Sequence, residues 1–301
     1  MPPSELDNLP LPGHGATAER FRRLAAIARR DLVDARLAEG HADAVAIRAE
    51  LGDRTQDQPG ARWGVWAAAP SSVRAGHSAH GWTLTGDRPW SSGAAWCTDA
   101  LVTADTGDGI RLFAVRNEAP HATALDGTWP AIGMAGSDSR TVRFAAAPAR
   151  PVGGPGAYVD RPGFWHGGIG VAACWYGGAL GVADTLRTAG PTLGPHGLAH
   201  LGAVDVALGA AGAVLAEAAA RIDADPRADA EHLAVRVRAT VERTATEVVD
   251  RVGRALGAGP LCRDGEHARR VADLTVYLRQ SHAESDLEHL GRLLVKEETP
   301  W

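Results

Sequence analysis

Apolar residues near the start of the chain recur at helical spacing. Phe21, Leu24 and Ile27 share one face of a predicted helix. The run 39–43 contains a glycine and several polar residues and interrupts this pattern, after which 44–51 again reads as helical. We therefore expect two helices in this part of the chain, separated by a break at 39–43.

The pattern then changes to short runs rich in β-branched and aromatic residues. These runs are separated by Gly, Asp or Pro and cover 63–66, 82–84, 100–103, 111–115 and 141–144. Short strands at such spacing predict a compact β-barrel or sandwich. Within 81–94 we expect a strand, a tight turn at Thr85-Gly86-Asp87 and a second strand ending in small hydroxylated residues.

The last part of the chain carries long helical patterns rich in Ala, Val and Leu. They cover 203–222, 231–256 and 267–278. A last helix is expected to start at Ser281, because Ser281-x-x-Glu284 has the spacing of a capping box. Consecutive helices of this length predict an antiparallel bundle.

Together these patterns predict an α+β fold in three parts. The parts are a helical segment over 1–60, a middle β domain, a β-barrel or a sandwich, over 61–160 and a C-terminal helical bundle over 161–301. The hydrophobic share of 45% and the charged share of 22% are ordinary for a globular protein. A net charge of -5 does not favour nucleic acid or an anionic membrane as a partner.

The cysteine spacing and the apolar runs indicate which further classes of protein are not expected. The three cysteines are far apart and no Cys or His spacing fits zinc, so we expect neither a disulfide framework nor a metal site. The first residues lack a basic stretch followed by an apolar one, so no signal peptide is expected. The most apolar run, 203–220, is interrupted by charged residues and glycines, so we expect no membrane span and a cytoplasmic protein.

Several motifs, in their order along the chain, resemble those of the acyl-CoA dehydrogenase family of flavoproteins. They are Trp90-Ser91-Ser92-Gly93 at the end of 81–94, Gly133-Met134-Ala135-Gly136-Ser137 within 132–144, Gly177-Gly178-Ala179-Leu180-Gly181, and Gly257-Ala258-Gly259 followed by Arg269-Arg270. The order of helices, β domain and helical bundle also resembles that family. The resemblance implies the acyl-CoA dehydrogenase-like fold, with the N-terminal helical domain reduced to a remnant.

The resemblance also implies a flavin site and its neighbours. Trp90, Ser91, Ser92 and Gly93 would lie against the ring of an FAD cofactor, with the Trp packed on the ring and a Ser hydroxyl donating to its N5 atom. The small-residue run 177–181 would lie on a helix beside the substrate.

The sequence departs from the family's pattern at several positions. Ala68-Ala69-Pro70 stands where the family has Thr-Glu-Pro, so a hydroxyl that would face the flavin is missing. Over 192–201 there is no good match to the Arg-x-x-Phe-Gly and Gln that contact the flavin pyrophosphate in the family. Arg279 stands where the family has its catalytic Glu, and an arginine cannot serve as a base. The alternative Glu position falls near Val171 and is also empty.

Other residues become candidates because the family's base is missing. His282 and Glu284 are the nearest titratable residues and are the candidate catalytic residues; related flavin monooxygenases place a His near this position, where it can act as a base. Their alternative interpretations are a surface residue for His282 and the cap partner of the last helix for Glu284.

Three further residues are candidates for substrate binding. Arg279 would bind a carboxylate or phosphate, or else form a structural ion pair with Asp273 or Asp286. Trp165 and His166 would line the pocket entrance, or else belong to a loop packed on the bundle.

Three functions remain open at this point. The resemblance most directly implies an FAD-dependent oxidoreductase acting on an acyl thioester, such as an acyl-CoA, or a related CH-CH substrate. The alternatives are a flavin-dependent monooxygenase on the same fold and a catalytically degenerate subunit of a flavoprotein complex. Because the bundles of that family form dimers or tetramers, the resemblance implies that the alanine-rich faces of 203–220 and 231–256 meet a partner chain, in a homodimer, a homotetramer or a heteromer with an intact homologue.

Overall fold

The computed structural model describes residues 9–68 and 72–296, which form two compact units. One unit, here the β unit, contains 36–131 and 135–164. The other, the helical unit, contains 9–35, 132–134 and the chain from Trp165 onward. The α+β class is as predicted, although the units do not follow chain order, because the boundary between them falls within the second helix.

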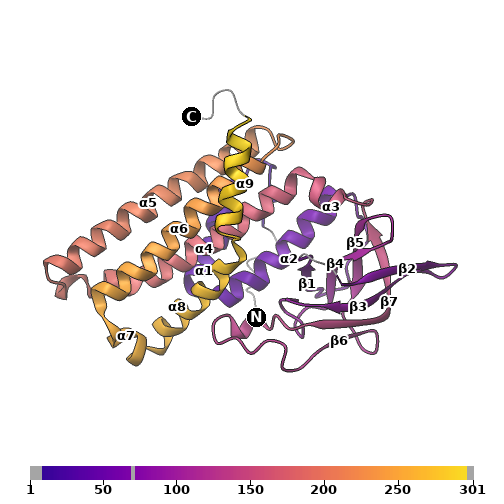
Figure 1. Ribbon diagram of the computed structural model, residues 1–301, viewed down its shortest axis with the longest axis horizontal. Helices are drawn as coiled ribbons and strands as arrows, with labels where there is room; N and C mark the ends of the chain where they lie inside the picture. Colours follow the sequence, from indigo (N-terminus) through magenta and orange to yellow (C-terminus); the bar gives the residue numbers. More distant parts are fainter. Residues whose placement is uncertain (1–8, 69–71, 297–301) are drawn as a thin grey trace. The chain divides into compact units, whose positions relative to one another are not determined.

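A seven-stranded sheet forms the β unit (Figure 1). Its strands are β1 (Trp63–Trp66), β2 (Arg74–Ser78), β3 (Gly81–Arg88), β4 (Asp99–Asp105), β5 (Ile110–Arg116), β6 (Ala122–Ala124) and β7 (Val142–Val152). The order is β1-β4-β2-β3-β7-β5, β6 pairs with β7, and β4 also pairs with β5 along its whole length. Only the pair Arg74↔Asp105 joins β2 to β4, so the predicted barrel is not established.

Two hydrophobic clusters stabilise the β unit. One contains Trp66, Leu84, Phe113 and Phe144, all of which are buried. The other lies under α2 (Leu32–Glu50), where Ile47 packs with strand residues. β4 and β5 are buried along most of their length, which explains why both read as nearly continuous runs of Ala, Leu, Val and Phe.

The tight turn predicted at Thr85-Gly86-Asp87 is wrong, because β3 runs without a turn from Gly81 to Arg88. Gly86 instead marks a register shift in the pairing of β3 with β7. Its φ of +129°, and the 2.5 Å that would separate a Cβ from the carbonyl oxygen of Ser72, explain why glycine occupies this bulge. The hairpin of this region is formed by β2 and β3.

The break predicted at 39–43 is also wrong. α1 (Thr17–Arg30) ends at Asp31, and α2 then runs unbroken through 39–43. The break lies at Asp31 because the residue is extended and its carboxylate accepts hydrogen bonds from the backbone N–H groups of Val33 and Asp34. Glu39 continues the helix through an ion pair with the residue one turn earlier.

The helical unit is formed by α1, the first residues of α2 and the long C-terminal helices (Figure 1). After α3 (Ala157–Asp160) in the β unit, these helices are α4 (Pro162–Ala189), α5 (Pro195–Ala224), α6 (Glu231–Leu256), α7 (Ala258–Arg263), α8 (Gly265–Tyr277) and α9 (Glu284–Leu294). Asp223 at the end of α5 accepts hydrogen bonds from the backbone of Gly15 and Thr17, so α5 caps the start of α1. The predicted succession of long helices is confirmed.

The glycine run 177–181 is a contact between helices. A Cβ on Gly177 would lie 2.2 Å from the carbonyl oxygen of Ala25, and one on Gly181 would lie 2.7 Å from that of Arg29. The backbone of α1 therefore occupies this face of α4. The expectation that the run lies beside a substrate stays a prediction.

Two helical segments, 162–192 and 195–224, are long and apolar enough to span a membrane, whereas the sequence analysis predicted no membrane span. The first is mostly buried inside the protein, whereas only 22% of the apolar stretch of α5 is buried. Core helices of globular proteins share this length and composition, so the finding by itself places neither segment in a membrane.

Candidate functional site

Trp90, which follows β3, combines an uncommon backbone conformation with a large exposed side chain. Its φ of 55° lies in the left-handed region, which bulky residues rarely adopt, and 57% of the residue is exposed. A large aromatic residue that is both strained and exposed does not contribute to the core. Backbone strain of this kind is concentrated at functional sites, so Trp90 is a candidate binding residue.

The segment that follows Trp90 is fixed to residues 137–140 by backbone hydrogen bonds. The N–H of Ser91 donates to the carbonyl of Arg140 at 3.0 Å, and the N–H of Gly93 donates to that of Ser137 at 2.7 Å. Asp138 accepts from the next two N–H groups, through its carbonyl at 3.0 Å and its carboxylate at 2.8 Å. We call 90–95 and 137–140 together the serine platform.

A chain of hydroxyl groups crosses the serine platform. The Oγ atoms of Ser137 and Ser139 are 2.8 Å apart, and those of Ser139 and Ser92 are 2.9 Å apart. Arg36 on α2 donates from Nε to the Ser92 hydroxyl at 3.2 Å. Ser91 is fully buried and donates to the carbonyl of Arg88 instead, so its hydroxyl is used in the fold.

Sequence reasoning found one part of this site and missed another. The motif 90–93 predicts Ser92 as a flavin-side residue, whereas the motif 133–137, which contains Ser137, predicts no role for that residue. Arg36 was missed because it is 56 residues away from Ser92 in a helix of ordinary composition. The structure does not test the sequence departure at 68–70, because Ala69 and Pro70 lie outside the described residues.

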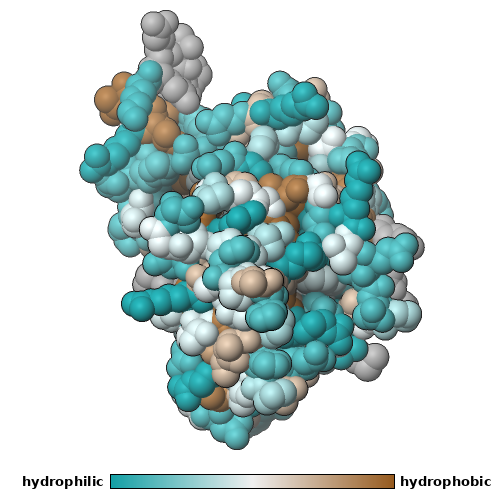
Figure 2. All heavy atoms as spheres, turned by 90° about the vertical axis from the view of Figure 1, so that its right-hand side faces the viewer, coloured by the Kyte–Doolittle hydropathy of each residue, from teal (hydrophilic) through white to brown (hydrophobic). Residues whose placement is uncertain are grey.

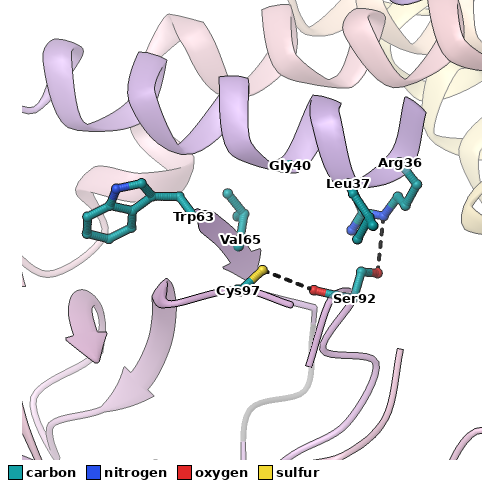
Figure 3. Close-up of a pocket in the computed structure, with 8 residues that line it drawn as sticks. Arg36, Leu37, Gly40, Trp63, Val65, Ser92 and Cys97 are labelled. Carbon is teal, nitrogen blue, oxygen red and sulfur yellow. Dashed lines mark hydrogen bonds between the residues drawn. The ribbon is translucent and has the colours of Figure 1, made fainter. Parts of the chain in front are cut away.

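A small cavity lies behind the platform, between α2 and β1 (Figure 3). Its volume is about 10 Å³, room for about one water molecule. Cys97 lines this cavity, and burial raises the pKa of its thiol to about 12. The thiol therefore stays protonated and is not a nucleophile. This cavity is too small for a flavin, whereas Trp90, on the same platform, is exposed to solvent.

The residues predicted before the last helix lie in the helical unit. Arg279 pairs with Glu242 of α6 at 2.7 Å, so the expected pairing with Asp273 or Asp286 is wrong. His282 is strongly exposed, and its ring Nδ1 lies 3.2 Å from Asp286. The catalytic roles of His282 and Glu284 and the substrate-binding role of Arg279 stay predictions.

The predicted capping box does not form, because neither Ser281 nor Glu284 caps the start of α9. α9 begins at Glu284, three residues after Ser281. Asp286 accepts a hydrogen bond from the backbone N–H of His282 at 3.0 Å, and Ser281 accepts from that of Ala283 at 3.2 Å. Ala283 has a φ of 48°, which turns the chain away from helical geometry one residue before α9 and shifts the cap.

Asp273 on α8 is the most deeply buried carboxylate of this region. It accepts from the backbone N–H of Met134 at 2.5 Å and from Arg269 at 3.1 Å, and burial raises its pKa. A Cβ on Gly133 would lie 2.2 Å from the carbonyl oxygen of Ala272, so 132–134 packs tightly on α8. The predicted motif at 132–144 therefore begins as an anchor on α8, and only its last residues form a strand.

Trp165 and His166 lie in the first turns of α4, so the predicted loop at this position is helical. His166 is almost fully buried within the helical unit. Their role at a pocket entrance stays a prediction. Within 9–68 and 72–296 no group of His, Cys, Asp and Glu side chains is arranged to hold a metal ion.

No family model and no curated protein matches this chain. Solved structures do match. TdsC from Paenibacillus sp. A11-2, in complex with FMN and indole, is 20% identical with a TM-score of 0.80, and the match covers 95% of this chain and 85% of that chain. KijD3, in complex with FMN and a dTDP-linked amino-keto sugar, is 20% identical with a TM-score of 0.77, over 99% of this chain and 83% of that chain.

XiaF from Streptomyces sp., in complex with FADH2, is 18% identical with a TM-score of 0.70, and the match covers 92% of this chain and 80% of that chain. These proteins are flavin-dependent enzymes with the acyl-CoA dehydrogenase-like fold. The chain shares that fold, as the sequence motifs predicted.

Proposed function

We propose that the protein is a flavin-dependent monooxygenase that works with FMN. The fold supports a flavin oxidoreductase, because similar structures contain FMN or FADH2. The monooxygenase was the alternative reading of the sequence. A similar structure, that of dibenzothiophene monooxygenase, favours this alternative.

The observation that carries the proposal is the exposed Trp90 beside the Ser92 hydroxyl. An exposed indole offers a flat face on which a planar isoalloxazine ring can stack. A hydroxyl at the end of a polar chain can donate to a ring nitrogen or carbonyl oxygen. The serine platform thus supplies the two kinds of contact that a flavin ring requires.

Two departures of the sequence support the proposal, one concerning the reaction and one concerning the cofactor. Arg279, at the place of the family's catalytic Glu, is a permanent cation paired with Glu242 and cannot abstract a proton. This argues against an acyl-CoA dehydrogenase. The missing pyrophosphate contacts over 192–201 favour FMN, which carries one phosphate and no pyrophosphate, over FAD.

Reduced flavin and dioxygen would supply the chemistry: one oxygen atom enters the substrate, the other leaves as water, and the flavin ends oxidised. The role of the chain is to bind and orient. Trp90 would hold the ring by stacking, and Ser92 would fix its orientation by donating a hydrogen bond.

The monooxygenase is tested with reduced FMN, ¹⁸O₂ and a panel of aromatic substrates that includes indole and dibenzothiophene. We expect one ¹⁸O atom in a product, dependent on the protein. Anaerobic bleaching of bound flavin by an acyl-CoA, without oxygen incorporation, would instead support the dehydrogenase.

A second candidate is the catalytically degenerate subunit. The strong exposure of His282 and the ion pair of Arg279 favour it, because neither residue lies in an enclosed setting. A purified protein that takes up neither FMN nor FAD, oxidised or reduced, would support this reading over the monooxygenase.

A further inference from the structure

Arg36 occupies an unusual position for an arginine. Its side chain is only 15% exposed, and it donates directly to the Ser92 hydroxyl of the platform at the small cavity that both residues line (Figure 3). Glu39, one turn further along α2 and 5% exposed, holds the guanidinium at 2.6 Å. The helix register and the buried ion pair together fix the direction in which Nε–H points.

The chemistry of the guanidinium restricts what the Ser92 hydroxyl can do. An arginine only donates, so one lone pair of Ser92 Oγ is used to accept from Arg36. The second protein neighbour of Oγ is Ser139, at 2.9 Å. If Ser139 donates to Ser92, both lone pairs are occupied, and the single Ser92 proton is available to a ligand.

From this arrangement we infer that Arg36 is a positioning residue that makes Ser92 a hydrogen-bond donor toward a bound ring acceptor. The inference rests on the proposed flavin function. Donation from a cation also polarises the Ser92 O–H group and strengthens the bond that it makes in turn. Arg36 therefore acts on the ligand through Ser92 and without touching it.

The test is a double-mutant cycle read out as the Kd for FMN, measured with both oxidised and anaerobically reduced FMN. The variants are Arg36→Met, Ser92→Ala and the two combined. We expect Arg36→Met to weaken FMN binding about tenfold when Ser92 is present and less than about twofold when it is Ala. Additive effects of the two substitutions would overturn the inference, because a general structural role does not require the Ser92 hydroxyl.

Two further variants control for loss of the fold. Arg62→Met removes another half-buried arginine of the β unit, one that donates to the carbonyl of Trp96, and should leave the Kd within about twofold. Arg36→Met/Glu39→Met removes both charges, so that no carboxylate stays buried without its partner, and should still weaken FMN binding about tenfold. Normal affinity in this double variant would overturn the inference.

The outcomes separate the inference from the function on which it rests. A wild-type protein that binds neither form of FMN overturns both. A wild-type protein that binds FMN, with unchanged affinity in Arg36→Met, overturns the positioning role and leaves the flavin function standing.

Discussion

At the scale of single residues, the candidate site contains residues with an unusual backbone conformation, exposure or burial. Trp90 is strained and exposed, and Ser92 joins a hydroxyl chain that ends on a buried arginine. The sequence motif predicted Ser92 because the family places a hydroxyl there. It could not predict Arg36, because a contact between α2 and the platform depends on packing and leaves no local pattern.

His267 gives the helical unit a pH dependence. The imidazole is 3% exposed and hydrogen-bonds Thr185 through Nδ1 at 2.9 Å. Burial lowers its pKa from the usual 6.5; the charge of Asp264 opposes this shift, and that of Arg270 adds to it. The folded state therefore resists protonation, and the unfolded state binds the extra proton as the pH falls through about 6.5.

We expect the free energy of unfolding to fall as the pH is lowered from about 7.5 to 5.5, by at most about 1.4 kcal/mol per pH unit for this one proton. Denaturant unfolding at several pH values measures the slope. His267→Gln should flatten it, and an equal slope in that variant would show that the pH dependence arises elsewhere.

At the scale of elements, the sequence predicted the positions of many strands and helices. The five predicted strand segments overlap β1, β3, β4, β5 and β7, and the three long helical patterns overlap α5, α6 and α8. Hydrophobic periodicity carries this information because each element buries one face. The errors at 39–43 and at Gly86 have another origin. There, a side-chain cap at Asp31 and a bulge in strand pairing determine the backbone conformation, and neither changes the hydrophobic pattern.

The close contact of α1 with α4 makes a prediction for one glycine. A methyl group at Gly177 would clash with the backbone of Ala25, which cannot move without shifting a whole helix. We expect Gly177→Ala to lower the free energy of unfolding by about 2 kcal/mol or more. Gly291→Ala is the matched control: α9 is open at that position, and the change should raise helix stability by up to about 1 kcal/mol. Equal effects of the two changes would contradict the packing described.

At the scale of the whole molecule, exposed apolar side chains occur in both units, and two of them lie on the long apolar helix α5. The face in Figure 2 is mainly hydrophilic, with apolar side chains only in scattered patches. On α5, in contrast, Val206 is 72% and Leu198 50% exposed on a long apolar helix. Exposed apolar surface of this kind marks association, and we expect a second copy of the chain to cover it.

Val206→Asp tests this expectation. A carboxylate buried in an apolar interface is costly, so the variant should dissociate an oligomer that the wild-type chain forms. Light scattering measures the mass. Leu261→Asp, at another exposed apolar residue of the helical unit, serves as the control and should leave the mass unchanged. A wild-type monomer, or a Val206→Asp protein of unchanged mass, would contradict the expectation.

The central claim is that the serine platform binds a flavin ring, and equilibrium titration with oxidised and anaerobically reduced FMN tests it most directly. The account predicts saturable binding of one FMN per chain. Trp90→Ala should weaken it about tenfold or more with an unchanged melting temperature, because the indole is exposed. Ile110→Ala, which removes an exposed apolar side chain elsewhere in the β unit, should bind FMN as the wild type does. Absence of binding in the wild type, or equal affinity in the Trp90→Ala variant, would contradict the account.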